Sequence, residues 1–291
     1  MFHLERILVP IDFSEHSAVA VSQAAALAHK FRSQITLLHV NEFSGAYAPA
    51  APLGFGRQTL EAARAEEVAG RRQRLEEFGS EELAGLPVKR ILCCGDPAGT
   101  IVRCAGHSDL ILIATYGHGM FRRFLLGSVT AKVLHDAECP VWTTMHCGQD
   151  AEPPVSEIRR ILCAVNLGSR SANVARFAGD LAARAGAELT VAHVVLDNPP
   201  NLPERYMFQW HDEAHWGADE RLHVLLTDLG IRAEPLVLSG GDVSSAISKG
   251  ATENRADLLV IGRNCEGREA RPLGGTAYSV ICDARCPVIS V

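Results

Sequence analysis

The sequence predicts an α/β protein made of two tandem copies of one doubly wound domain, each with a five-stranded parallel sheet. Three observations support this. The chain of 291 residues is long enough for two ordinary domains. Its second half repeats the first in order. Within each half, short runs rich in Ile, Leu and Val alternate with helix-like segments, which is the pattern of strands joined by helices.

The repeat is visible as three pairs of segments in the same order: 6–12 with 160–166, 109–114 with 257–262, and 139–141 with 286–288. The offset falls from 154 to 147 along the chain, as insertions and deletions in loops would produce. A polar segment with two prolines, at 148–157, reads as a linker. We therefore expect one domain at 1–147 and a second at 158–291.

Each element of the first half follows from its local pattern. Strands are expected at the apolar runs 6–11, 34–40, 87–93, 109–114 and 140–145. Helices are expected between them: an alanine-rich one capped by Ser14, a Glu/Arg-rich one at 57–78, one opening at Asp96-Pro97 and one at about 127–136. The first strand can lie inside the sheet, which creates a switch point between strands one and four.

The chemistry is expected at the carboxyl ends of the strands, because doubly wound sheets bind ligands there, at the switch point. Strands one, two and four end at Pro10, Ile11 and Asp12, at Val40, and at Ala114. Asp12 carries an acceptor-only carboxylate, which suits the hydroxyl groups of a ribose. Beyond Ala114, glycines bracket a loop that leads to a helix start at Gly127, Ser128 and Val129. Free backbone N–H groups at a helix start form an anion site.

This loop and two further segments resemble the universal stress protein domain. ATP-binding members of that family carry G-x2-G-x9-G-[S/T] after strand four, and this chain has that spacing at 114, 117, 127 and 128. The segment V-P-I-D-F-S at 9–14 and the ending C-P-V at 139–141 are also typical. The likeness covers essentially the whole chain, twice. It implies an adenine nucleotide alpha hydrolase-like fold and ATP, with or without Mg²⁺, as the ligand.

The resemblance also implies a role for each matching residue. Adenosine would be flanked by Pro10, Ile11 and Asp12, adenine contacted by the Val40 backbone, and the phosphates held by Gly117, Gly127, Ser128 and Val129. One position departs from the motif, because Ala114 replaces its first glycine. A methyl group there is harmless if the backbone φ is negative and crowds the ligand otherwise.

The second half departs further from the motif. Asn166 replaces the aspartate, and Cys265 replaces the second glycine, where a left-handed backbone would cost about 1–2 kcal/mol. Glu266 and Glu269 add negative charge beside the expected phosphates, although nearby arginines can offset it. We therefore expect about one nucleotide per chain, bound by the first half.

Other patterns are weaker. His211 and His215 lie four apart on one helix face; zinc could use them with a carboxylate, but the sequence shows no third ligand. A solvated helix face is the favoured interpretation, so no metal is expected. Buried packing is expected of Cys93-Cys94. His39 and His193 recur at the same strand end, which favours a shared structural role.

Bulk properties narrow the function. A net charge of −6, from 28 basic and 34 acidic residues, argues against nucleic-acid binding. The absence of a signal-like start and of an apolar run of about 20 residues predicts a cytoplasmic protein without a membrane partner. We expect an ATP-dependent stress-response switch or partner-binding module. A slow Mg²⁺-dependent ATPase stays open, as does a scaffold without nucleotide. In any of these, the last strands, Val141–Thr144 and Val288–Val291, are edges that can pair within the chain or in a homo-oligomer.

Overall fold

The computed structural model describes residues 4–42, 57–115, 126–144, 157–197, 207–263 and 275–291. The chain forms two compact units. The amino-terminal unit contains Leu4–Gly119 and Ser128–Cys139, and the carboxy-terminal unit contains Pro140–Val291 together with Met1–His3 and Met120–Gly127. In the described part of the chain, no helix has the length and apolar character that crossing a membrane requires.

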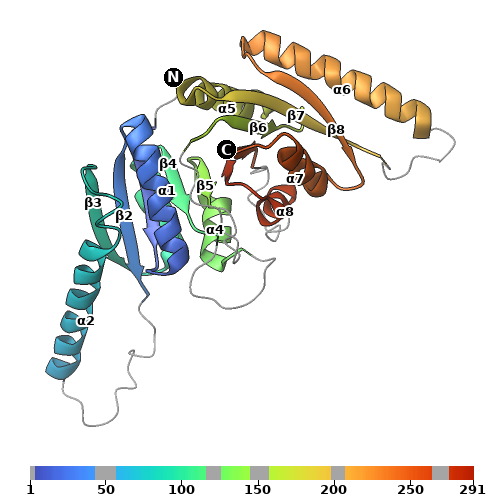
Figure 1. Ribbon diagram of the computed structural model, residues 1–291. Coiled ribbons are helices and arrows are strands. Elements are labelled where there is room, and N and C mark those ends of the chain that lie inside the picture. Colours follow the sequence, from blue (N-terminus) through green and yellow to red (C-terminus); the bar gives the residue numbers. More distant parts are fainter. Residues whose placement is uncertain (1–3, 43–56, 116–125, 145–156, 198–206, 264–274) are drawn as a thin grey trace. The chain divides into compact units, whose positions relative to one another are not determined.

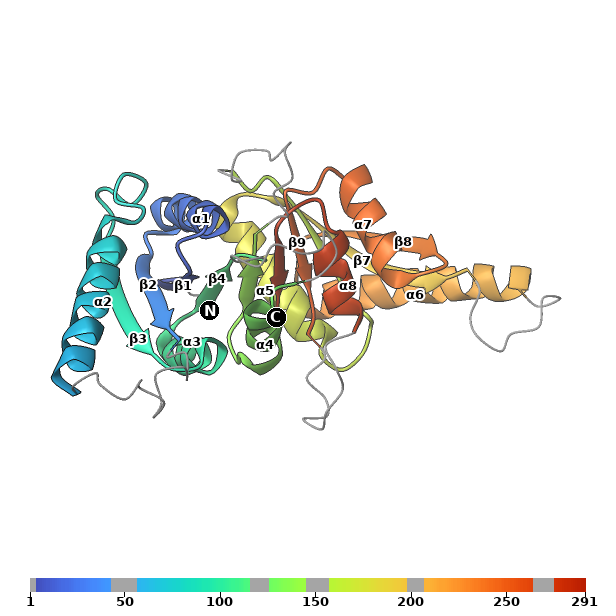
Figure 2. The same ribbon diagram turned by 90° about the horizontal axis from the view of Figure 1, so that it is seen from below.

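The amino-terminal unit is a parallel sheet with helices on both faces. Its strands follow the order β3-β2-β1-β4. The elements in chain order are β1 (Arg6–Ile11), α1 (Glu15–Phe31), β2 (Gln34–Asn41), α2 (Arg57–Glu77), β3 (Val88–Cys94), α3 (Pro97–Cys104), β4 (Leu110–Ile113) and α4 (Ser128–Asp136). Figure 2 shows α1 and α3 on opposite sides of β1 and β2. The predicted order, with the first strand inside the sheet and a switch point between β1 and β4, is confirmed.

The carboxy-terminal unit repeats this plan, with the strand order β5-β10-β9-β6-β7-β8. Its elements are β5 (Val141–Thr143), β6 (Arg160–Ala164), α5 (Ser171–Ala185), β7 (Glu188–Leu196), α6 (Met207–Leu229), β8 (Glu234–Gly240), α7 (Val243–Glu253), β9 (Leu258–Ile261), α8 (Thr276–Asp283) and β10 (Val288–Ser290). In Figure 1, α5 and α6 lie on one side of the β6–β8 strands, and α7 and α8 on the other.

The last strands of the two repeats pair with each other, as their exposed edges predicted. β5 runs antiparallel to β10, with Trp142 opposite Ile289. The Trp142 side chain is fully buried in this pairing region. β5 therefore packs as part of the carboxy-terminal unit, although it ends the first sequence repeat.

The two helix starts predicted from capping residues are confirmed. Ser14 caps α1, where its Oγ accepts a hydrogen bond from Ser17 N at 3.2 Å. Asp96 caps α3, where its Oδ2 accepts from Gly99 N at 2.8 Å, and Pro97 occupies the first turn.

The inner strands β4 and β9 are buried along their whole length, whereas most residues of the edge strands β3 and β8 are half-buried. This corrects the expectation for Cys93 and Cys94. The Cys93 side chain is half-buried and that of Cys94 is exposed, because β3 has a neighbouring strand on one side only.

Candidate functional site

The turn after β1 holds the Asp12 carboxylate in one orientation. Its Oδ1 accepts hydrogen bonds from Ser14 N at 3.0 Å, from Ser14 Oγ at 2.5 Å and from Ser17 Oγ at 2.6 Å. Asp12 also lies at the amino end of α1, where the helix dipole stabilises a negative charge. The half-buried carboxylate is thus fixed just past the carboxyl end of β1, where Pro10 and Ile11 precede it.

The second unit keeps this turn but not its charge. Asn166 Oδ1 accepts from Gly168 N at 2.9 Å and from Ser171 Oγ at 3.1 Å, so it has the same structural role as Asp12. The residues that follow, Phe13 and Leu167, both have a left-handed backbone, with φ of 64° and 55°. The substitution therefore removes a carboxylate without altering the fold of the turn.

His39 and His193 support the same turn in the two units, as their recurrence predicted. Each Nδ1 lies 2.9 Å from a carbonyl oxygen, that of Ile11 and that of Val165 respectively. His39 Nε2 lies 3.2 Å from Arg71 Nη1, so the ring donates through Nδ1 and accepts through Nε2. Burial is the main cause that lowers the pKa of His39, and the charge of Arg71 adds to it. His39 is therefore a neutral structural group.

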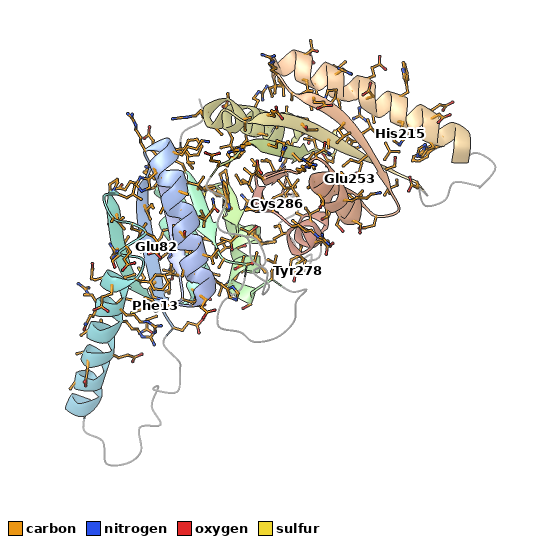
Figure 3. All side chains as sticks on the ribbon, viewed as in Figure 1. Phe13, Glu82, His215, Glu253, Tyr278 and Cys286 are labelled. Carbon is orange, nitrogen blue, oxygen red and sulfur yellow. The ribbon has the colours of Figure 1, made fainter. Side chains whose placement is uncertain are left out.

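An arginine from the following long helix also contacts the turn in both units. Arg74 Nη2 donates to the Phe13 carbonyl at 3.4 Å, and its guanidinium lies 4.6 Å from the centre of the Phe13 ring. Figure 3 labels Phe13. Arg221 Nη2 donates to the Leu167 carbonyl at 2.7 Å. Sequence reasoning missed this pair. The signal was available, since the two arginines are 147 residues apart, the offset of the domain ends.

Val40 lies at the carboxyl end of β2, opposite Cys93 of β3. Its side chain is half-buried. β1 and β2 are parallel neighbours, with Ile11 opposite His39. The next residues, Asp12 and Val40, therefore both lie at the carboxyl edge of the sheet. The two groups assigned to the nucleoside are therefore on adjacent strand ends.

Ala114 fits the end of β4 without strain. Positive φ occurs among the described non-glycine residues at Phe13, Arg32, Leu167 and Arg255, a set that does not include Ala114. The Ala114 side chain is buried. The methyl group therefore does not force an unfavourable backbone, and the missing glycine has no conformational cost at this position.

Packing explains why the two units differ here. In the second unit the matching residue is Gly262, where an added Cβ would lie 3.2 Å from Val174 Cγ2 on α5. The position of Val174 corresponds in the first unit to Ala20 on α1, which is fully buried. The first unit thus combines Ala114 with Ala20, and the second combines glycine with valine.

The start of α4 is tied to the end of β4. Thr130 Oγ1 donates to the Ala114 carbonyl oxygen at 2.8 Å. This contact sets the first turn of the helix against the switch point, where Ser128 is exposed and Gly127 and Val129 are half-buried. The backbone N–H groups of this turn lack helical partners by geometry, as an anion site requires. Gly117 lies outside the described residues, as do Cys265, Glu266 and Glu269 of the second domain.

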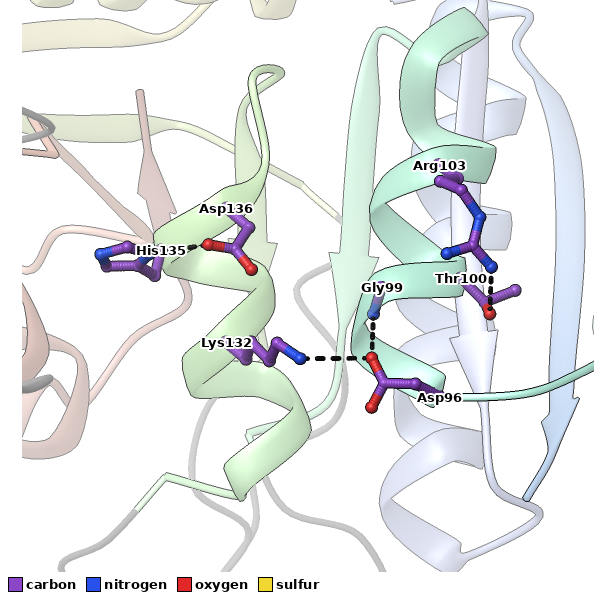
Figure 4. A network of polar contacts seen from close by, with 7 residues as sticks. All are labelled: Asp96, Gly99, Thr100, Arg103, Lys132, His135 and Asp136. Carbon is purple, nitrogen blue, oxygen red and sulfur yellow. Dashed lines mark hydrogen bonds and ion pairs between the residues drawn. The ribbon is translucent and has the colours of Figure 1, made fainter. Parts of the chain in front are cut away.

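A basic residue lies one helical turn after Ser128. Lys132 Nζ pairs with Asp96 Oδ2 at 3.2 Å and links α4 to the capped start of α3 (Figure 4). The hydrogen bond from Gly99 N, followed by Lys132, lowers the pKa of Asp96. In the second unit Asp242 caps α7 in the same way, but Val280 replaces the lysine. The first unit alone therefore places an ammonium group in this helix turn.

Comparison with known proteins agrees with these features. The model of the universal stress protein family matches residues 3–144 and again residues 157–291. A universal stress protein of Thermus aquaticus is 34% identical over 142 residues, which are 46% of this chain and 94% of that protein. One of Mycobacterium tuberculosis is 28% identical over 209 residues, which are 70% of this chain and 68% of that protein.

A solved structure shares the fold over the full length. The crystal structure of a universal stress protein from Archaeoglobus fulgidus has a TM-score of 0.68 and 22% identity. The match covers 99% of this chain and 96% of that chain. With the family matched once in each half and the parallel order β3-β2-β1-β4 in the first unit, the chain belongs to the universal stress protein family, as a tandem of two such domains.

Proposed function

We propose that the first domain binds one adenine nucleotide, ATP, at the carboxyl edge of its sheet. The observation that carries this is the placement of two complementary groups at one switch point. The Asp12 carboxylate is held after β1, and the open amino end of α4 is tied to the end of β4 through Thr130. A carboxylate accepts from ribose hydroxyls, and helix N–H groups donate to phosphate.

The roles follow from this placement. Pro10, Ile11 and Asp12 flank the adenosine, and the Val40 backbone contacts adenine. Phosphates are held by Gly117, Gly127, Ser128 and Val129, next to Ala114, and Mg²⁺ accompanies them. Lys132 supports the phosphate end through its positive charge, since it lies in the first turns of α4, where its ammonium group pairs with Asp96 Oδ2.

The second domain binds ATP weakly or not at all in this proposal. Asn166 keeps the turn but offers an uncharged oxygen, and Val280 offers no ammonium group. Both changes remove charge that a nucleotide would use. The domains span 1–147 and 158–291, with the linker at 148–157, and act as one asymmetric protein.

The activity that fits this arrangement is a cytoplasmic stress-response switch, in which ATP occupancy of the first domain changes what the chain binds. The described part of the first site is made of groups that hold a ligand. Asp12 is committed to the turn through Oδ1, and His39 is neutral and held between Ile11 and Arg71. Neither is arranged to activate water, which favours binding over turnover.

The Asp12→Asn variant tests the site, because the second domain shows that asparagine preserves the turn. Loss of one charge-assisted hydrogen bond, about 1.5 kcal/mol or more, weakens Mg-ATP binding roughly tenfold. Isothermal titration of the full chain measures this, and far-UV circular dichroism checks the fold. Asn166→Asp is the matched control, since it changes the same atom in the other domain and leaves the first site intact. Equal ATP affinity in Asp12→Asn and wild type would overturn the proposal.

A further inference from the structure

The outer face of α6 carries a large apolar side chain that the fold does not bury. Trp216 is 71% exposed and Val224 is 53% exposed, and these are the large hydrophobic residues that lie open to solvent in the described part of the chain. The other side of the helix packs on β7, β8 and α5 (Figure 1) through the buried residues Ala218, Leu222 and Leu226. At about 100° per residue, Trp216 points roughly 200° away from Ala218. Trp216 and Val224 therefore face away from the sheet, about two turns apart on one line.

Acidic side chains surround Trp216 on this face. Its neighbours three and four residues away along the helix, in both directions, are all exposed carboxylates: Asp212, Glu213, Asp219 and Glu220. Residues at these spacings lie about 5–6 Å apart between Cβ atoms on a helix surface. Of the nearby basic groups, His223 Nε2 lies 3.7 Å from Asp219 Oδ2, whereas Arg221 Nη2 donates to the Leu167 carbonyl at 2.7 Å. The helix therefore presents an indole with carboxylates on both sides of it.

The first domain shows that the fold does not require such a face. Leu75 of α2 and Leu222 of α6 are both buried at the repeat offset of 147, which aligns the two helices. In this alignment Ala69 takes the place of Trp216. Where α6 has four acidic residues around the indole, α2 has one, because the matching positions hold Ala65, Glu66, Arg72 and Gln73. Packing of the long helix on the sheet therefore does not account for the tryptophan or for its acidic surroundings.

We propose that this face of α6 docks a basic segment of a partner protein, with an arginine stacked on the Trp216 indole. A guanidinium stacks on an aromatic face and pairs bidentately with a carboxylate, and an ammonium group does both less well. Tryptophan and arginine are also enriched among the residues that carry most of the binding energy in protein interfaces. A negatively charged partner would be repelled by the four carboxylates, and an apolar one would strip them of water without pairing them. Charge complementarity therefore selects a basic partner.

The size of the face fits a short segment. Trp216 and Val224 are separated by about 12 Å along the helix axis, at a rise of about 1.5 Å per residue. An extended segment of about four residues spans that length, at roughly 3.3 Å per residue. A peptide of six residues is therefore long enough to cover the indole and the carboxylates on both sides of it. The surface belongs to the second domain and contains no residue of the proposed nucleotide site, so it names a partner's chemistry independently of ATP.

Fluorescein-labelled hexa-arginine is the probe that tests the surface. Its fluorescence anisotropy measures binding to the full chain at low ionic strength, where exposed charges are least screened. Trp216→Leu should weaken this binding about 3- to 10-fold although it alters no charge, because it removes the aromatic face. Trp216→Phe should recover part of the affinity. Hexa-lysine should bind the wild type less tightly than hexa-arginine does, and this preference should vanish in Trp216→Leu.

Charge is tested by two double variants of equal net charge. Asp212→Asn with Glu220→Gln should weaken hexa-arginine binding about 3- to 10-fold, because the two carboxylates flank the indole on the same line of the helix. Glu81→Gln with Glu82→Gln is the matched control, since it removes the same charge from exposed positions in the first domain. It should bind as the wild type does. All of these side chains are exposed, and circular dichroism confirms that the helices persist in each variant.

Three results would overturn the proposal. In the first, Trp216→Leu binds hexa-arginine as tightly as the wild type does. In the second, the first-domain control loses as much affinity as the α6 double variant, so that net charge alone explains the binding. In the third, sedimentation shows that the wild type dimerises through a contact that Trp216→Leu abolishes, so that a second copy of the chain covers the face. None of these results depends on ATP, so the nucleotide proposal is tested separately.

Discussion

Replacing Ala20 with valine tests the packing account of the Ala114 substitution. Ala20 is fully buried on α1, and its counterpart Val174 lies so close to Gly262 that an added Cβ would be 3.2 Å away. With valine at position 20, the first domain would have the valine of the second domain together with the Ala114 methyl group. We expect these two side chains to compete for the same space. Overpacking of this kind typically costs about 1–3 kcal/mol in the free energy of unfolding.

The second change, Ala114→Gly, should remove most of that cost. Alone, Ala114→Gly lowers stability by roughly 0.5–1 kcal/mol, because glycine loses more backbone entropy on folding. In the double variant it opens the space that valine needs, so the two effects are not additive. We expect a coupling of about 0.5–2 kcal/mol in favour of the pair, measured from urea unfolding of the full chain.

The second domain offers the reverse control. Val174→Ala opens a cavity beside Gly262, and Gly262→Ala should refill part of it. The single variant Gly262→Ala keeps Val174, so its added methyl group does not have that space. If both double-variant cycles are additive within about 0.5 kcal/mol, the two positions do not share space and the packing account is refuted.

Two further predictions concern charge. Lys132→Gln should weaken Mg-ATP binding about 3- to 10-fold, because it removes an ammonium group one helical turn from the phosphate site. Titration calorimetry measures this affinity, and the second-domain change Val280→Ala should leave it unaltered. His39→Gln should reduce the loss of stability on acidification. The pKa of His39 is lowered in the folded chain, so on acidification the unfolded chain takes up the proton first. The contribution to stability is therefore present above the ordinary pKa near 6.5 and is lost as the pH falls below that value. The loss is at most about 1.4 kcal/mol per pH unit. Urea midpoints between about pH 7.5 and pH 5.5 measure the slope, and identical slopes in variant and wild type would contradict the role given to His39.

Features set by short stretches of sequence were predictable. Ser14 and Asp96 are caps because a short polar side chain can reach N–H groups two or three residues on, a local geometry. The place of Asp12 followed from topology, since parallel strands joined by helices put their carboxyl ends on one edge. The repeat then supplied His39 and His193 as an internal comparison.

Features set by distant contacts were not predictable. The bond from Arg74 to the Phe13 carbonyl joins residues 61 apart. In the second unit, the residue that matches Ala114 is Gly262, whose space is limited by Val174 of a different element. Asp197 and His211 are brought together by the packing of α6 on β7. Exposure of Cys94 depended on β3 being an edge strand, which local patterns do not specify.

The central claim is that each chain binds one ATP molecule, and that the first of its two similar domains holds it. Native mass spectrometry of the full chain with Mg-ATP tests this most directly, because it counts ligands on each molecule. The account predicts a single bound ATP at saturation. At a subsaturating concentration, the occupancy falls in Asp12→Asn, whose affinity is about tenfold lower, and is retained in Asn166→Ala. Two ATP molecules bound with equal affinity, or none at saturating concentration, would contradict it.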